Sequence, residues 1–206
     1  PTAANQAVAR VDAVLDTVST FSGWPVGSTP TTSDHVRGAA FDGLYHWMFP
    51  FDGPMVIGIN TVDGTMKGHS VSGWPASITL DTGGRFQTGI HTDKTNLWLI
   101  PYQADSIVHL DSVTGTATGY KNWPPSPFLA GMSPPPLCVG AIWDGQYIWM
   151  MVPLGDLVVR FDTLTGNMKG VFNFPSTYVN GGMSFRSVAF DPATKSLWFL
   201  PVAANM

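Results

Sequence analysis

Short apolar runs of strand length alternate with turn-forming residues along the whole chain. Four of these runs are rich in aromatic residues, and each of the four ends at a proline, namely Pro50, Pro101, Pro153 and Pro201. The prolines recur with a period of about 50 residues, and a period of this size is typical of repeated small sheets. The pattern therefore predicts four similar units that are built from strands.

Two turn signals divide each unit into strands. In the first and third units the pairs Asp42-Gly43 and Asp144-Gly145 lie between two apolar runs, and an Asp-Gly pair in this setting predicts a tight hairpin. A second turn contains a glycine in the first three units, at Gly64, Gly115 and Gly166. A Trp-Pro or Phe-Pro pair then ends the last strand, at Trp24-Pro25, Trp74-Pro75, Trp123-Pro124 and Phe174-Pro175. We therefore expect four strands in each unit.

The two ends of the chain match complementary halves of one unit. Residues 185–206 match the first and second strands, and residues 7–25 match the third and fourth strands. We expect the two halves to pair into a closing blade, since such pairing removes open sheet edges. The expected arrangement is a single domain over residues 1–206, with blades at about 34–75, 85–124, 137–175 and 185–206 plus 7–25.

Three other arrangements remain open at this point. Two chains could together build an eight-bladed ring, or the chain could be part of a longer protein. Ala and Val dominate residues 3–18, so an amphipathic helix there is a competing local interpretation. The repeat alignment favours strands, because Arg10-Val11-Asp12 lines up with Arg160-Phe161-Asp162.

With these motifs in place, the chain resembles the β-propellers with kelch-like, NHL-like or YVTN-like repeats. The Phe41-Asp42-Gly43 and Trp143-Asp144-Gly145 hairpins, the tryptophans of the second strands and the turn over residues 162–166 carry the resemblance. It covers almost the whole chain and implies an all-β ring of four blades. The double glycine of kelch repeats and the Trp-Asp ending of WD40 repeats are missing, so no subfamily follows. Propellers of this kind serve as lectins, scaffolds, lyases and hydrolases, so the fold alone implies no function.

The amino-acid composition agrees with an all-β chain and excludes some classes of binding partner. Only 12% of the residues are charged, all 14 acidic residues are Asp, and 22 Gly and 17 Pro fit many tight turns. The net charge of −4 and the scattered basic residues argue against a nucleic-acid partner. No apolar stretch is long enough to span a membrane. Cys138 is the only cysteine, so no internal disulfide can form, and we expect a buried thiol.

Candidate catalytic groups are few. The five histidines have no metal-ligand spacing, so we expect no metal and no cofactor. His46 takes the place that Leu or Ile holds in the other units, and we expect a buried imidazole there. The aspartates of the turns, such as Asp12, Asp111 and Asp162, are expected to cap backbone N–H groups, with calcium binding as the lesser alternative. The four second-strand tryptophans are expected in the core between blades: Trp47, Trp98, Trp149 and Trp198.

The loops between units are the most plausible place for a binding site. Residues 25–37, 75–87, 124–139 and 175–186 differ in sequence while the strands stay alike. Equivalent positions at the start of the first strands carry Arg37, Gln87, Val139 and Arg186, which symmetry would gather at the channel mouth. Six residues form the candidate ligand site: Asp34, His35, Arg37, Arg85, Gln87 and Arg186. This cluster suits a carboxylate, sulfate, sugar or peptide group, with side chains that only solvate the rim as the competing interpretation.

Three function classes follow from the sequence. The first is a non-catalytic recognition or assembly module that binds a protein partner or self-associates through the loops. The second is a lectin-like glycan binder, against which the unequal loops count. The third is a lyase or hydrolase with His35 or His46 as base and Arg37 or Arg186 as the anion-stabilising group. The compartment stays open, with a slight preference for an extracellular or surface location.

Overall fold

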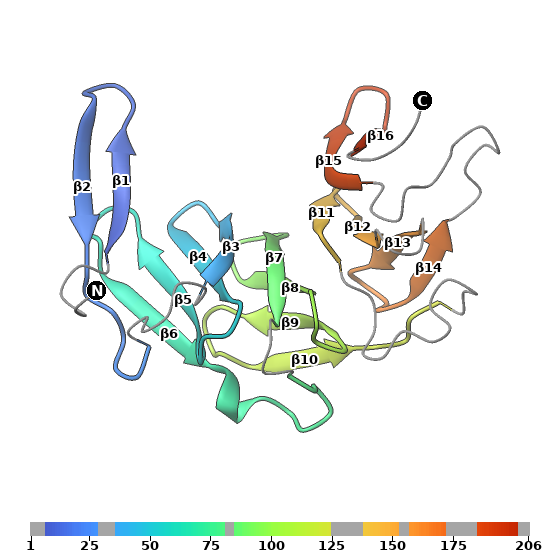
Figure 1. Ribbon diagram of the computed structural model, residues 1–206, viewed down its shortest axis with the longest axis horizontal. Coiled ribbons are helices and arrows are strands. Elements are labelled where there is room, and N and C mark those ends of the chain that lie inside the picture. Colours follow the sequence, from blue (N-terminus) through green and yellow to red (C-terminus); the bar gives the residue numbers. More distant parts are fainter. Residues whose placement is uncertain are drawn as a thin grey trace.

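The computed structural model describes residues 7–28, 36–80, 85–124, 138–152, 157–171 and 185–201, and these form an arc of antiparallel sheets (Figure 1). Three sheets have four strands each and two have only two strands. The N-terminal hairpin is β1 (Val8–Asp12) and β2 (Thr17–Phe21). Blade 1 consists of β3 (Val36–Phe41), β4 (Tyr45–Pro50), β5 (Met55–Asn60) and β6 (Met66–Ser70). Blade 2 consists of β7 (Phe86–His91), β8 (Asn96–Pro101), β9 (Ile107–Asp111) and β10 (Ala117–Tyr120). Blade 3 consists of β11 (Gly140–Trp143), β12 (Tyr147–Val152), β13 (Leu157–Asp162) and β14 (Met168–Val171). The C-terminal hairpin is β15 (Phe185–Asp191) and β16 (Ser196–Pro201), and a short 3-10 helix, η2, covers Val71–Gly73.

The Asp-Gly hairpins form as the sequence predicts. Gly43 and Gly145 have φ angles of 99° and 103°, a conformation that glycine adopts without steric cost. Asp42 Oδ1 accepts hydrogen bonds from the backbone N–H groups of Leu44 and Tyr45, at 2.8 and 2.7 Å. Its Oδ2 accepts from Trp47 Nε1 at 2.7 Å, so one carboxylate fixes both the turn and the tryptophan after it.

The second turn shows why glycine recurs there. Gly64, Gly115 and Gly166 have φ angles of 75°, 77° and 73°. A ring from the preceding sheet covers each of them: Phe21 lies on Gly64, His69 on Gly115 and Tyr120 on Gly166. A side chain at any of these glycines would overlap that ring, so the turn and the contact between blades depend on the same residue.

The hydrophobic core lies between blades. Trp47 and Phe49 of blade 1 pack in one buried cluster with Leu97, Leu99 and Leu110 of blade 2. Trp98 of blade 2 repeats this contact on blade 3, where its ring meets the Phe161 ring edge-on, with centroids 5.1 Å apart. Trp47 and Trp98 are 0% and 3% exposed, which confirms the prediction that they are core residues.

The predicted pairing of the two chain ends is wrong for this structure. β1 and β2 form one two-stranded sheet, β15 and β16 form another, and the two hairpins lie at opposite ends of the arc (Figure 1). Each hairpin packs on the complete blade beside it, and the three wedges do not turn far enough to bring the hairpins together. Strands at Val8–Asp12 and Thr17–Phe21 also replace the alternative helix over the described part of residues 3–18.

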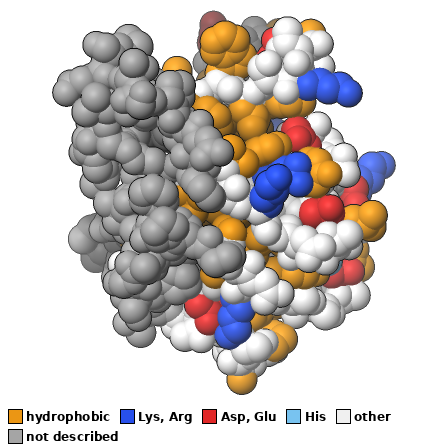
Figure 2. Space-filling model, turned by 90° about the vertical axis from the view of Figure 1, so that its right-hand side faces the viewer, with side chains coloured by type: hydrophobic (Ala, Val, Ile, Leu, Met, Phe, Trp, Pro, Cys, Tyr) orange, Lys and Arg blue, Asp and Glu red, His pale blue; other side chains and the backbone are white. Residues whose placement is uncertain are grey.

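The open ends change the environment of two predicted core tryptophans. Trp198 is 63% exposed, because no blade among the described residues follows and covers β16. Trp149 is only half-buried beside the two-stranded sheet of β15 and β16. Figure 2 looks onto this side of the molecule and shows hydrophobic side chains reaching the surface. Within the described residues, no helix has the length and apolar character needed to cross a membrane.

Candidate functional site

The predicted channel-mouth residues share one backbone feature, a β-bulge at the start of the first strand of a sheet. The strand register shifts between Val36 and Gly38 in β3, between Phe86 and Thr88 in β7, and between Phe185 and Ser187 in β15. The extra residues at these shifts are Arg37, Gln87 and Arg186. A bulge interrupts the regular alternation of side chains along a strand. The side chains of Arg37 and Gln87 therefore point in a direction that a regular strand would not give them.

Arg37 is exposed and lies on an aromatic ring. Its guanidinium carbon is 3.7 Å from the centroid of the Phe51 ring, a close cation–π contact. Phe51 itself is buried and meets the Tyr102 ring at 5.6 Å between centroids. The rings beneath the guanidinium therefore hold it in one position at the surface.

Arg85 and Gln87 lie beside this contact. Arg85 Nη1 donates to the carbonyl oxygen of Gly53 at 2.6 Å, and its backbone N–H donates to the carbonyl oxygen of Phe51 at 2.6 Å. Gln87 lies against β3, because a Cβ atom on Gly38 would be only 2.9 Å from the Gln87 carbonyl oxygen. Gln87 Oε1 is buried and has no hydrogen-bond partner among the described residues. An acceptor buried in this way can take a donor from a ligand.

The structure thus gathers Arg37, Arg85 and Gln87 around the connection from β4 to β5. Asp34 and His35 lie outside the described residues, as does the side chain of Arg186. Most of the four variable loops also lie outside, since residues 29–35, 81–84, 125–137 and 172–184 are not described. Around half of the predicted site can therefore be placed, and that half brings two arginines to a connection that also contains Asp52, on a chain of net charge −4.

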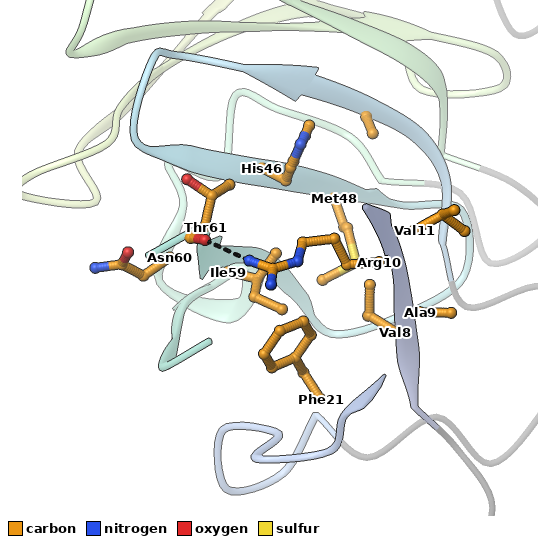
Figure 3. Close-up of a pocket in the computed structure, with 11 residues that line it drawn as sticks. Val8, Ala9, Arg10, Val11, Phe21, His46, Met48, Ile59, Asn60 and Thr61 are labelled. Atoms are coloured by element: carbon orange, nitrogen blue, oxygen red, sulfur yellow. Dashed lines mark hydrogen bonds between the residues drawn. The ribbon is translucent and has the colours of Figure 1, made fainter. Parts of the chain in front are cut away.

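A second candidate site, which the sequence did not indicate, is a cavity of about 470 Å³ between the N-terminal hairpin and blade 1. Figure 3 shows Arg10 of β1 extending across it, with His46 and Met48 of β4 and Ile59 of β5 on the opposite wall. Arg10 Nη1 donates to the carbonyl oxygen of Thr61 at 3.1 Å. The sequence did not indicate this cavity, because the predicted closing blade places the strands of residues 185–206 beside β1, where their side chains would fill the space.

His46 corrects one prediction and weakens another. Its imidazole is exposed rather than buried, and it packs against Phe41 with centroids 4.7 Å apart. The register pairs Phe41 with His46 and Val36 with Pro50. His46 and Arg37 therefore lie near opposite ends of the β3–β4 hairpin, roughly 13 Å apart along the strands at about 3.3 Å per residue. The structure separates this pair, and the other pairs that the enzyme interpretation allows, which contain His35 or the side chain of Arg186, lie outside the described residues.

The groups with shifted pKa values are mostly turn aspartates with structural roles. Burial alone would raise the pKa of Asp42, but hydrogen bonds from Tyr45, Trp47 and Leu44 hold it below its usual value. Burial lowers the pKa of His109, although Asp111 opposes the shift. Burial raises the pKa of the Cys138 thiol to about 12, as expected for a buried thiol. Within the described residues, no group of three His, Cys or Asp side chains is placed to hold a metal ion.

Neither a protein-family model nor a curated protein matches the chain, but solved structures do. A virginiamycin B lyase from Staphylococcus aureus matches with a TM-score of 0.62 and 18% identity over 95% of this chain and 56% of its own. A nidogen/laminin complex matches with a TM-score of 0.58 and 10% identity over 89% and 60%. An auxiliary nutrient binding protein from Bacteroides thetaiotaomicron VPI-5482 gives 0.55 and 12% over 82% and 36%.

These likenesses concern the fold. At identities of 10–18% they show that the chain has β-propeller architecture, in agreement with the resemblance seen in its repeats. The chain spans 56% of the length of the lyase that it matches. The activity and partners of these proteins are therefore not carried over to it.

Proposed function

We propose that this chain is a non-catalytic recognition or assembly module that binds a protein partner at the rim around Arg37, Arg85 and Gln87. The observation that carries the proposal is the Arg37 guanidinium, which a β-bulge presents at the surface on the buried Phe51 ring. A cation held in this way loses little side-chain entropy when an anion binds to it. The favoured partner group is a carboxylate of a protein, because guanidinium and carboxylate match in charge and geometry.

The surroundings of Arg37 support this role. Arg85 holds Gly53 and Phe51 in place and adds positive charge, and Gln87 supplies a buried acceptor for a backbone or amide N–H group. A peptide that carries both a carboxylate and N–H donors satisfies this combination. Two of the similar structures are named for binding, a nidogen/laminin complex and a nutrient binding protein, so the architecture suits a binding module.

The proposal is tested with the full chain on arrays of peptides and glycans. We expect binding to acidic peptides and loss of binding when each Asp or Glu is replaced by Asn or Gln. Because a hydrogen bond to a charged group contributes about 1.5–3 kcal/mol, Arg37→Ala should weaken binding by about 10- to 100-fold. Arg85→Ala and the double variant Arg37→Ala with Arg186→Ala should also weaken it.

Lys169→Ala is the matched control, because it removes one exposed positive charge from β14. Equal binding by the Arg37→Ala and Lys169→Ala variants would overturn the proposal. Binding to glycans but not to peptides would favour the lectin class instead. Turnover of a lactone or ester panel that survives Arg37→Ala would favour an enzyme whose site lies elsewhere in the chain.

A further inference from the structure

We propose that two copies of this chain complete each other's open blades, with β16 of one copy pairing with β1 of the other. The described residues of each chain form three complete blades and two half-blades, so in this arrangement two copies give a closed ring of eight blades. This inference goes beyond the proposed function, because it concerns the sheet edges at the ends of the arc and not the rim around Arg37. Four observations carry it.

The first observation is the register of the complete blades. Their second and third strands pair Trp47 with Gly58, Trp98 with His109 and Trp149 with Arg160. The repeat alignment makes Trp198 the next tryptophan of this series and Arg10 its expected cross-strand partner. β16 and β1 therefore have the sequences of a second and a third strand, although no described strand pairs with either on that side.

The second observation is the contact that Arg160 makes in blade 3. Its guanidinium carbon lies 4.3 Å from the Tyr147 ring centroid and 5.9 Å from that of its partner Trp149. Arg10 is the equivalent of Arg160 on β1, and Trp198 is the equivalent of Trp149 on β16. In the completed blade Arg10 of one copy lies beside Trp198 of the other, which reproduces the Arg–Trp part of this contact, while Ser196 takes the place of Tyr147.

The third observation is that the cavity beside Arg10 has the walls of a tryptophan pocket. Each buried second-strand tryptophan packs onto the following blade: Trp98, for example, lies in one cluster with Ile148, Met150 and Phe161. The equivalents in blade 1 are His46, Met48 and Ile59, and these three line the cavity of about 470 Å³ (Figure 3). Trp198 is 63% exposed and Leu200 59% exposed, so β16 carries two apolar side chains that lack such a pocket.

The fourth observation concerns the outer strands. In three sheets a ring of the last strand covers the turn glycine of the next blade, as Tyr120 covers Gly166. Blade 3 has the smaller Val171 at this position, and it is 41% exposed. The matching turn of the N-terminal hairpin has Asp16, at a φ angle of 52°, in place of glycine. The small Val171 leaves room for the Asp16 side chain, which an aromatic ring at residue 171 would exclude. The outer strand of blade 3 in one copy therefore fits the turn of the N-terminal hairpin in the other.

A second copy is the occupant that fits the geometry. The chain's own β16 lies at the other end of the arc from β1 (Figure 1), so it does not reach the cavity. A partner arc related by a two-fold axis presents β16 to β1 at both junctions at once. This arrangement removes both open edges, and open edges with exposed apolar residues are otherwise a risk for aggregation.

The proposal is tested by light scattering after size-exclusion chromatography of the full chain, and by disulfide trapping. We expect twice the mass of one chain, and about 30-fold or greater weakening of the dimer by Trp198→Ala, as for a central interface tryptophan. Because Trp198 is exposed in the single chain, this variant should keep its fold. Circular dichroism and the unfolding midpoint check that point.

Trapping uses two variants that each carry one added cysteine besides the buried Cys138, and the two chains are mixed. The register places Leu197 opposite Val11, so Leu197→Cys chains mixed with Val11→Cys chains should form a covalent dimer. Val18→Cys is the matched control, since Val18 pairs with Val11 on β2 and is similarly exposed, at 65% against 66%. It lies one strand farther away, beyond the reach of a disulfide.

Three results would overturn the proposal. The first is a single-chain mass with no trapped dimer. The second is a disulfide that forms within one chain of the double variant Val11→Cys with Leu197→Cys, which would show self-closure. The third is an open polymer instead of a species of two chains. None of these results bears on peptide binding at Arg37, so the two proposals fail independently.

Discussion

The Phe49 ring of β4 occupies the space into which a side chain at Gly89 of β7 would project. Phe49 is 0% exposed, and Gly89 lies on the first strand of the next blade. The absence of a side chain at residue 89 therefore sets how closely blades 1 and 2 approach. The contact joins residues of different blades, so a substitution at Gly89 tests whether the arc depends on packing between neighbouring blades.

Gly89→Ala should destabilise the chain by about 1–3 kcal/mol, because an inserted methyl group forces a packed ring to move. The unfolding midpoint in urea measures this effect. Gly73→Ala is the control, since nothing lies within 4 Å of a Cβ atom placed there. Equal midpoints for the two variants would show that blades 1 and 2 do not pack through Phe49.

Asp42→Ala should also destabilise the chain, for a different reason. The substitution leaves Trp47 Nε1 buried without its acceptor and removes two backbone hydrogen bonds of the hairpin. An unsatisfied buried donor costs about 1–3 kcal/mol. Asp63→Ala, which removes an aspartate from an exposed turn, should cost less in the same urea titration. A larger loss for Asp63→Ala would contradict this account.

The features that the sequence predicted well are local ones. Gly43, Gly64 and the Asp42 cap depend on residues a few positions apart, so the chain carries their signal directly. The repeats also reveal that Arg37 and Gln87 are equivalent, although the bulge that both share was not predicted. Turns, strands and the blade pattern could therefore be predicted from the sequence alone.

The features that the sequence predicted badly depend on whether a complete blade lies next to the repeat. Trp198 has the sequence environment of Trp47, yet one is 63% exposed and the other 0%. The difference comes from the missing neighbour and not from the strand itself. The same reason explains His46, whose equivalents Leu97 and Ile148 are buried by a complete preceding blade. Equivalence between repeats predicts in which direction a side chain points, but it does not predict whether a neighbouring blade buries that side chain.

The free energy of unfolding should decrease as the pH is lowered from about 4 to about 2, and Asp93 is one residue that contributes to this decrease. Burial alone would raise the pKa of Asp93, but hydrogen bonds from Thr95 and Asn96 lower it to about 2. A carboxyl group with a lowered folded-state pKa stabilises the fold above its unfolded value of about 3.9, and this contribution is lost as the pH falls through about 2. Asp93→Asn should therefore lower the urea midpoint at pH 6, and this difference should shrink towards pH 2.

The neighbouring variant Lys94→Gln serves as the control for Asp93, because it changes one charge of the same turn and leaves the carboxylate in place. Its difference from the unaltered chain should stay nearly constant over this pH range. A constant difference for Asp93→Asn as well would mean that the hydrogen bonds of Asp93 do not stabilise the turn.

Cys138 should be unreactive in the folded chain. It is 0% exposed in the cluster between blades 2 and 3, and burial raises its pKa to about 12. Because the thiolate is the reactive form, an aromatic disulfide reagent at pH 8 should label no thiol in the native state and one thiol per chain in urea. Leu164→Cys, at a position that is 92% exposed, should by contrast react at once. Rapid native labelling of the unaltered chain would mean that blades 2 and 3 separate readily, and an arc that opens there could not present β1 and β16 in fixed positions.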